Sequence, residues 1–267
     1  MAHIFDFDII FPAVIFIWFA GLIVFYSGKQ QFNKLLGNIF FGLGFLLLVA
    51  LIIYLWINLQ RPPLKTSGET RLWYSVFVPF VGFTLYYRWK MRWLPAYSII
   101  LASVFVLINY FEPENFDKTL MPALQSDWFV PHVVVYMFAY SILTVSMLIA
   151  IKALYIYYTR HEIDKNLLTL ADNVVYIGFA FLSFGLLFGA FWAKEAWGTY
   201  WSWDPKETWS LISWLFYLLY IHLRYKHKQS PVTALWVLAL SFVILLICWF
   251  GVNYLPSASD SVHRYST

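Results

Sequence analysis

The chain is poor in cysteine and in charge, and both shortages exclude whole classes of protein. Cys248 is the one cysteine among 267 residues, so an internal disulfide, a Cys-x-x-Cys redox pair and a Cys-x-x-Cys-His haem-attachment motif are impossible. Charged residues make up 12% of the chain and hydrophobic residues 61%, whereas a soluble domain carries about a quarter charged residues. The composition indicates an integral membrane protein.

Other features are lacking as well. The segment Met1–Asp8 contains two aspartates and no lysine or arginine, so we expect no cleaved secretory signal. The sequence has no visible internal repeat, low-complexity tract or separate soluble domain. The pI near 9.0 does not indicate a nucleic-acid partner, because the basic residues fall in short loops between apolar runs. We expect a single membrane domain over residues 1–267.

Long apolar runs dominate what is present. A bilayer core requires about 20 apolar residues in helical form. The sequence offers eight such candidates, at 9–27, 36–59, 71–88, 94–111, 132–157, 168–192, 207–224 and 232–252. We therefore predict an all-α polytopic bundle of about eight transmembrane helices.

The distribution of charge between the predicted spans sets their orientation. One set of loops collects eleven basic and three acidic residues, and the other set collects seven basic and eleven acidic residues. Cytoplasmic loops carry the excess of lysine and arginine. This rule places both termini outside, together with the loop between the sixth and seventh spans.

That outer loop, residues 193–209, is rich in aromatic residues. It reads Trp197-Gly-Thr-Tyr-Trp-Ser-Trp-Asp-Pro-Lys-Glu-Thr-Trp209. Asp204 suits the N-cap of a helix, Pro205 its first position and Glu207 the capping-box position, so the loop leads directly into the seventh span. Tryptophan and tyrosine also form belts at membrane interfaces. A belt is scattered over many spans, whereas this loop concentrates its aromatic residues, as a platform for a flat apolar ligand would.

Two histidines lie on the same predicted side as this loop. His132 begins the fifth span and His263 lies in the C-terminal tail. Each by itself could be an ordinary boundary or tail residue. Together, beside an aromatic platform, they could supply both axial ligands to one haem iron.

The other histidines are different. His222 lies fifteen residues after Glu207 on one predicted helix, which places it about 22 Å deeper. Its side chain either extends toward the basic loops on the inner side of the membrane or serves a second site near the inner leaflet. We expect His161 and His227 to face water in the inner loops, and we expect no special role for His3.

The aromatic loop resembles the tryptophan-rich signature of the CcsA family of cytochrome c assembly proteins. The segment Pro122–His132 resembles the family's segment that ends in the first external histidine. The segment from Gly251 to His263 resembles the one that carries the second, although Ser-Val-His-Arg-Tyr stands where the family usually has Gly-Leu-His-Ser-Tyr. His222 is placed like the family's membrane-embedded histidine. The related CcmC exporters share a tryptophan-rich loop but lack the Pro-Lys-Glu-Thr-Trp continuation.

The resemblance implies a protein that holds haem b at its outer face and presents it to the Cys-x-x-Cys-His segment of apocytochrome c, with a CcsB/ResB-like membrane protein as partner. It implies haem-iron ligation by His132 and His263, and a lower-ranked second haem at His222. The haem-handling surface would comprise Trp197, Tyr200, Trp201, Trp203, Asp204 and Trp209. The expected location is the bacterial inner membrane, with the loop on the periplasmic or outer face. A thylakoid membrane is the second-ranked location.

Several interpretations remain open at this stage. Lys194, Lys206 and Arg264 could pair with haem propionates or be ordinary interfacial cations. No residue must act as a general acid or base, so the chain could be one component of a synthase without a catalytic side chain. A b-type electron-transfer subunit would place histidine pairs on facing helices within the membrane. A transporter would carry charges or broken helices at the midplane.

Overall fold

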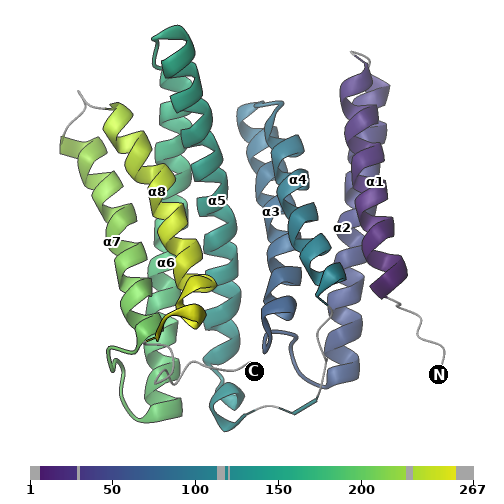
Figure 1. Ribbon diagram of the computed structural model, residues 1–267. Helices are drawn as coiled ribbons and strands as arrows, with labels where there is room; N and C mark the ends of the chain where they lie inside the picture. The colour runs from purple at the N-terminus through teal and green to yellow at the C-terminus, as the bar shows by residue number, and fades with distance from the viewer. Residues whose placement is uncertain (1–6, 29–30, 113–117, 120, 227–230, 257–267) are drawn as a thin grey trace. The chain divides into compact units, whose positions relative to one another are not determined.

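The structure is a computed structural model that describes residues 7–28, 31–112, 118–119, 121–226 and 231–256, and these residues form eight α-helices (Figure 1). The helices are α1 (Phe7–Ser27), α2 (Gln31–Leu59), α3 (Ser67–Trp89), α4 (Leu94–Phe111), α5 (Phe129–Arg160), α6 (Lys165–Trp197), α7 (Pro205–Lys226) and α8 (Pro231–Trp249). Two short 3-10 helices, η1 (Pro122–Gln125) and η2 (Gly251–Tyr254), flank the second set of four. The predicted all-α bundle of eight helices is confirmed.

Six of these helices are long and apolar enough to cross a membrane, namely α1, α2, α4, α5, α6 and α8. The two others carry charged residues near their ends: Glu69, Arg71 and Arg88 in α3, and Lys206, Glu207, Arg224 and Lys226 in α7. The helices α5 and α6 have 32 and 33 residues, more than the roughly 20 that a bilayer core requires. Helices of this length tilt within the apolar layer or extend past it.

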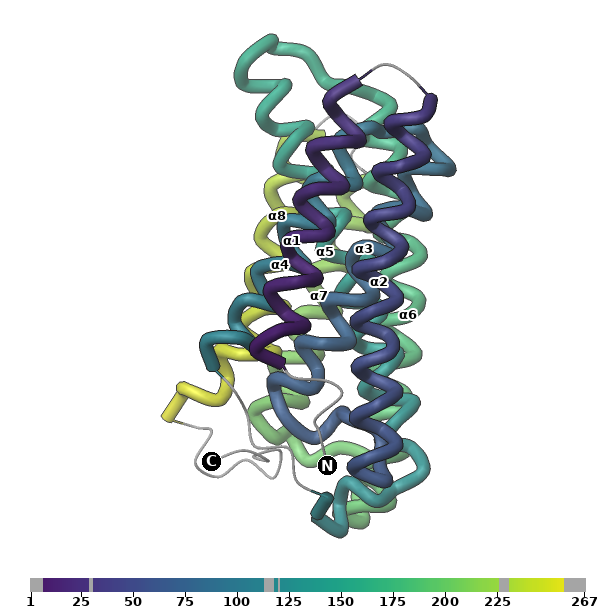
Figure 2. The backbone as a smooth tube through the Cα atoms, turned by 90° about the vertical axis from the view of Figure 1, so that its right-hand side faces the viewer, coloured from purple at the N-terminus to yellow at the C-terminus, as the bar shows by residue number. Residues whose placement is uncertain are grey.

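The helices fall into two compact units, residues 1–119 with α1–α4 and residues 120–267 with α5–α8. In unit 1, α1 packs against α2 and α4, and α3 packs against α4. In unit 2, α5 packs against α6 and α8, and α7 packs against α8 and α6. Figure 2 traces the backbone of these helices along the chain. That the whole chain forms one membrane domain stays a prediction.

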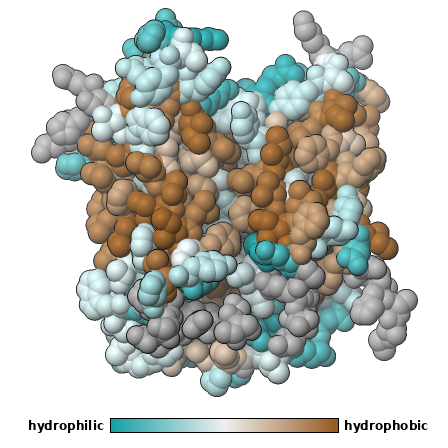
Figure 3. Space-filling view, viewed as in Figure 1, coloured by the Kyte–Doolittle hydropathy of each residue, from teal (hydrophilic) through white to brown (hydrophobic). Residues whose placement is uncertain are grey.

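Apolar side chains cover the outside of each unit as well as its core. Brown, hydrophobic residues gather in the middle part of each unit in Figure 3, and teal, hydrophilic residues lie nearer the ends. Large side chains such as Phe16, Ile23, Leu46 and Phe184 are exposed in the isolated chain. A lipid environment accounts for this surface, because soluble monomers rarely expose large contiguous apolar patches.

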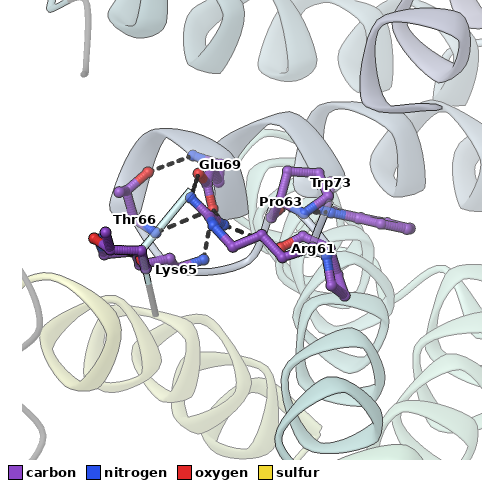
Figure 4. Close-up of polar contacts among 8 residues, drawn as sticks. Arg61, Pro63, Lys65, Thr66, Glu69 and Trp73 are labelled. Carbon is purple, nitrogen blue, oxygen red and sulfur yellow. Dashed lines mark hydrogen bonds and ion pairs between the residues drawn. The ribbon is translucent and has the colours of Figure 1, made fainter. Parts of the chain in front are cut away.

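A buried ion pair fixes the connection between α2 and α3 in unit 1. Arg61 and Glu69 form two hydrogen bonds, of 2.9 and 2.7 Å, and their side chains are 3% and 0% exposed. Glu69 also accepts the backbone N–H of Lys65 at 2.6 Å and closes a capping box with Thr66 (Figure 4). One carboxylate thus holds the preceding loop and the first turn of α3 together.

A second ion pair joins α6 to α7 in unit 2. Arg224 donates two hydrogen bonds to Asp172, of 2.8 and 2.7 Å, and the hydroxyl of Tyr220 donates a third, of 2.7 Å. The planar guanidinium matches both carboxylate oxygens, which makes this contact directional as well as strong. It fixes the relative position of the two helices whose far ends carry the aromatic loop.

Candidate functional site

The beginning of α5, the end of α6 and the start of α7 lie at one end of unit 2, where η1 and η2 also lie (Figure 1). Two hydrogen bonds tie η1 and the residue after it to α6. The indole of Trp192 donates to the carbonyl of Ala123 at 2.6 Å, and the hydroxyl of Ser126 donates to Glu195 at 2.5 Å. We call this the loop end of unit 2, since residues 198–204 connect α6 to α7 there.

His132 lies on the first turns of α5, with its ring against α6. Its Nδ1 lies 2.9 Å from the carbonyl oxygen of Gly185. A carbonyl can only accept, so Nδ1 carries a proton in this contact, and in the neutral imidazole Nε2 then holds the lone pair. Histidines that ligate metals commonly donate their other ring N–H to a carbonyl or carboxylate in this way.

Aromatic rings pack on the imidazole of His132. Trp192 stacks on it, with the ring centroids 5.4 Å apart and the planes at 29°. Tyr136 meets it edge-on at 4.7 Å, and Trp197 meets Trp192 edge-on at 4.8 Å. A row of rings therefore leads from His132 to the last residue of α6, where the predicted aromatic loop begins.

A second row of rings reaches the loop itself. Trp128 packs on Phe191 at 4.7 Å, and Phe191 meets Tyr200 at 6.4 Å. Tyr200 is 55% exposed and Trp203 is 67% exposed. The loop end thus combines a histidine fixed by the backbone with aromatic faces that a flat apolar molecule could contact.

The backbone of the loop explains how these rings are held. Gly198 ends α6 with φ +83°, a conformation that costs glycine little because it lacks Cβ. Asp204 accepts the N–H of Lys206 at 2.9 Å, and the carboxylate of Glu207 accepts the N–H groups of Asp204 and Ser202 at 3.2 and 2.8 Å. The predicted reciprocal cap at the start of α7 is confirmed.

Glu207 provides a test of this arrangement. Glu207→Ala removes the acceptor for two backbone N–H groups and for the hydroxyl of Ser202. We expect a loss of about 1–3 kcal/mol in the free energy of unfolding, because the N–H groups lose their buried acceptor. Denaturant titration of the purified protein measures it. Glu162→Ala, at an exposed glutamate in the α5–α6 turn, is the control, and an equal loss in both variants would contradict the role of Glu207.

The other predicted residues take different positions. Trp201 is half-buried and meets Trp203 edge-on at 5.8 Å, and Trp209 is half-buried on the first turn of α7. The ammonium of Lys194 donates to the carbonyl of Gly198 at 2.8 Å and lies 5.5 Å from the centre of the Tyr200 ring. Lys206 is half-buried. The predicted residues His263 and Arg264 lie outside the described residues, as do His3 and His227.

His222 lies far along α7 from the loop end. Its side chain is exposed in unit 2, on the same face of α7 as Leu215, Leu218 and Leu219. His161 ends α5 with φ +54° and is exposed. That His161 faces water in an inner loop stays a prediction. A second ligand site at His222 stays a prediction.

Sequence reasoning missed three residues that hold His132. In the sequence, Trp192 was interpreted as the end of an apolar run and Tyr136 as an ordinary residue of a span. Gly185 was interpreted as one of several small residues in the sixth span. One signal was available: Gly185, Gly189 and Trp192 follow one another at four and three residues, so they share one face of a helix. Nothing in that spacing identified the side chain opposite them.

Comparisons with known proteins agree with this picture. The family model described as "Cytochrome C assembly protein" matches residues 13–258. The cytochrome c biogenesis proteins CcsA of Guillardia theta and Chlamydomonas reinhardtii are 33% and 32% identical, over 88% and 85% of this chain and 88% and 67% of their own lengths. A CcsA protein of Prochlorococcus marinus is 32% identical over 89% of this chain and 90% of its own length.

A solved structure shares the fold. The chain superposes on the cytochrome c haem lyase CcmF with a TM-score of 0.71 and 16% sequence identity. The match covers 91% of this chain but only 46% of that one, so this chain spans less than half of the larger protein. At such low identity the likeness concerns the arrangement of helices.

Proposed function

Because the chain belongs to the cytochrome c assembly protein family, and within it to the CcsA type, we propose that the loop end of unit 2 binds haem and presents it to apocytochrome c. The assembly role follows from the family. The proposal adds the substrate, the residues that hold it and the side of the membrane on which it is presented.

The geometry of His132 carries the proposal. A histidine whose Nδ1 donates to the Gly185 carbonyl is in the form that suits iron ligation through Nε2. The exposed rings of Tyr200 and Trp203 offer apolar faces for a porphyrin, and the buried ring of Trp192 supports His132 by stacking on it. The described residues therefore fit haem as a substrate. The form proposed is haem b, which is not covalently attached to protein. His263 is the proposed second ligand.

The reaction assigned to this site is the addition of two cysteine thiols across the two haem vinyl groups. In each addition, sulfur bonds to one carbon of the vinyl group and the thiol hydrogen goes to the other, so that nothing leaves. The chain's contribution is positioning, since holding reacting groups near contact supplies much of the rate. The proposed site needs no acid or base from this chain. Arrival of the peptide's own histidine at the iron would displace His132 or His263.

A partner accounts for His222. Its exposed position among leucines on α7 suits a face shared with another membrane protein, and we assign that role to a CcsB/ResB-like chain. The partner would supply the other axial histidine of a second, deeper haem. Binding of a bis-histidine second haem that survived removal of every histidine from the partner would contradict this assignment.

The proposed location is the bacterial inner membrane with the loop end on the outer face. There the haem would lie on the same side as an exported apocytochrome. A thylakoid membrane is the alternative, with its lumen in place of the periplasm.

The test compares His132→Gly, His263→Gly and His161→Gly in the full chain co-expressed with the partner, in a host that lacks its own cytochrome c assembly system. His132→Gly should retain less than about a tenth of the haem per protein, because loss of a mere orienting group already weakens metal binding roughly 10- to 100-fold. Added imidazole should restore part of it. Maturation of a c-type reporter should fall in parallel, and His161→Gly should match the wild type. An unchanged haem spectrum in both His132→Gly and His263→Gly would defeat the proposal.

A further inference from the structure

Three glycines of α6 lie against side chains of α5. A Cβ atom built on Gly178 would lie 2.6 Å from Leu143, one on Gly185 would lie 2.5 Å from Tyr136, and one on Gly189 would lie 2.7 Å from His132. Real Cβ atoms essentially never approach other heavy atoms so closely. We call these three glycines, 178, 185 and 189, the glycine ladder.

The ladder has the same spacing on both helices. From Gly178 to Gly189 the steps are seven and four residues, and from Leu143 back to His132 they are again seven and four. Steps of four and seven residues return to one face of an α-helix, and the two sequences run in opposite directions because α5 and α6 are antiparallel neighbours. Each of these α5 side chains therefore enters a gap that a glycine leaves, and the side chain that enters the gap at Gly189 is His132.

Gly189 also explains why a helix carbonyl can accept a hydrogen bond from His132. The side chain of a helical residue points toward the N-terminus and covers the preceding turn. A side chain at position 189 would therefore cover the carbonyl of residue 185. Gly189 has no side chain, and the imidazole of His132 occupies that place. Its Cε1 and Nδ1 are the atoms closest to the position of the missing Cβ. From there Nδ1 lies 2.9 Å from the carbonyl oxygen of Gly185.

We propose that Gly189 is a positioning residue for His132: it admits the imidazole to the backbone of α6, where the Gly185 carbonyl selects the Nδ1-protonated form and leaves Nε2 as the iron ligand. This inference rests on the proposed function, which makes His132 a haem ligand. The acceptor is a backbone carbonyl, so no single side-chain deletion removes it. A side chain at position 189 would fill the gap, and the imidazole could then no longer reach this carbonyl.

Gly189→Ala is the decisive variant, and Gly178→Ala is its matched control. Both add one methyl group to the same helix face against an α5 side chain, but only the first displaces the imidazole. We expect Gly189→Ala to weaken haem binding by roughly 10- to 100-fold, the effect of losing a group that orients a metal ligand. We expect Gly178→Ala to bind haem like the wild type. Haem titration of the detergent-purified full chain with its partner measures both, and equal weakening in the two variants would overturn the inference.

A second measurement needs neither haem nor activity. In protein labelled with ¹⁵N-histidine and free of haem, the signal absent from His132→Gln reports the tautomer of His132. We expect the Nδ1-protonated form in the wild type and in Gly178→Ala, and loss of that preference in Gly189→Ala. A wild-type signal from the Nε2-protonated form would overturn the inference even if Gly189→Ala failed to fold.

Failure of the proposed function can be distinguished from failure of the inference about Gly189. If His132→Gly binds haem like the wild type, the proposed function fails, while the tautomer signal still decides whether Gly189 orients His132. If His132→Gly loses haem and Gly189→Ala does not, the proposed function stands and Gly189 has no role in it.

Discussion

Glu69→Ala should destabilise the protein by about 3–5 kcal/mol, the usual loss when one partner of a buried ion pair is removed. The side chains of Glu69 and Arg61 are 0% and 3% exposed, so the guanidinium would keep its charge in a buried place after losing its carboxylate. The variant also removes the acceptor for the N–H of Lys65 and opens the capping box with Thr66. The free energy of unfolding in detergent, followed by the helical circular dichroism signal, measures the loss.

The double variant Arg61→Met with Glu69→Leu is the control that separates charge from packing. It removes both charges and keeps apolar volume, and such replacements of buried pairs are often neutral or stabilising. We expect it to be more stable than Glu69→Ala by at least about 2 kcal/mol. A double variant as unstable as the single one would mean that the capping contacts of Glu69, and not the charge on Arg61, account for the loss.

The positions of the helices could be predicted because the bilayer limits what an apolar run can form. Without water, backbone N–H and C=O groups must bond within the segment, so a long apolar run becomes a helix. The predicted spans differ from the helices mainly at their ends. The capping box of Thr66 and Glu69 starts α3 at Ser67, before the apolar run, and Gly198 ends α6 only after Trp197. Caps depend on polar residues, which a hydropathy pattern does not register.

Contacts between distant residues could not be predicted. Asp172 and Arg224 are 52 residues apart, and in the sequence they were two charges among those of the inner loops. Their bidentate contact depends on how α6 and α7 face each other, which spacing along the chain does not reveal. The buried pair of Arg61 and Glu69 was missed for a related reason. Charged residues beside a span normally indicate solvent, and only packing places these two inside.

The candidate site was predicted in part. His132 was chosen because it shares a predicted side with the aromatic loop, and it does lie at the loop end of unit 2, two ring contacts from Trp197. The cap of Asp204 and Glu207 followed from residue types at fixed offsets, which is local information. The surroundings of His132 were missed, because a glycine gap and a backbone carbonyl have no signature in side-chain chemistry. His263 falls outside the described residues, so its role stays a prediction.

Trp192→Ala is the second change expected to have a large effect. The indole of Trp192 is 2% exposed, stacks on His132 and donates to the Ala123 carbonyl at 2.6 Å. Truncating a buried aromatic side chain costs about 3–5 kcal/mol through lost packing and the cavity that remains. We expect that loss in the free energy of unfolding. We also expect loss of bound haem, because the imidazole loses the ring that holds one of its faces and η1 loses its bond to α6.

Trp192→Phe separates the contribution of ring contact with His132 from that of the hydrogen bond to Ala123. Phenylalanine keeps a ring on His132 but cannot donate to Ala123, so the expected cost in stability is about 0.5–1.5 kcal/mol for the missing hydrogen bond plus a smaller packing loss. If ring contact positions His132, Trp192→Phe should retain haem with an unaltered axial-ligand spectrum, and Trp192→Ala should not. Equal loss of haem in both variants would assign the effect to the tether between Trp192 and η1. In that case the segment before α5, and not the stacked indole, would hold the start of α5 and its histidine in place.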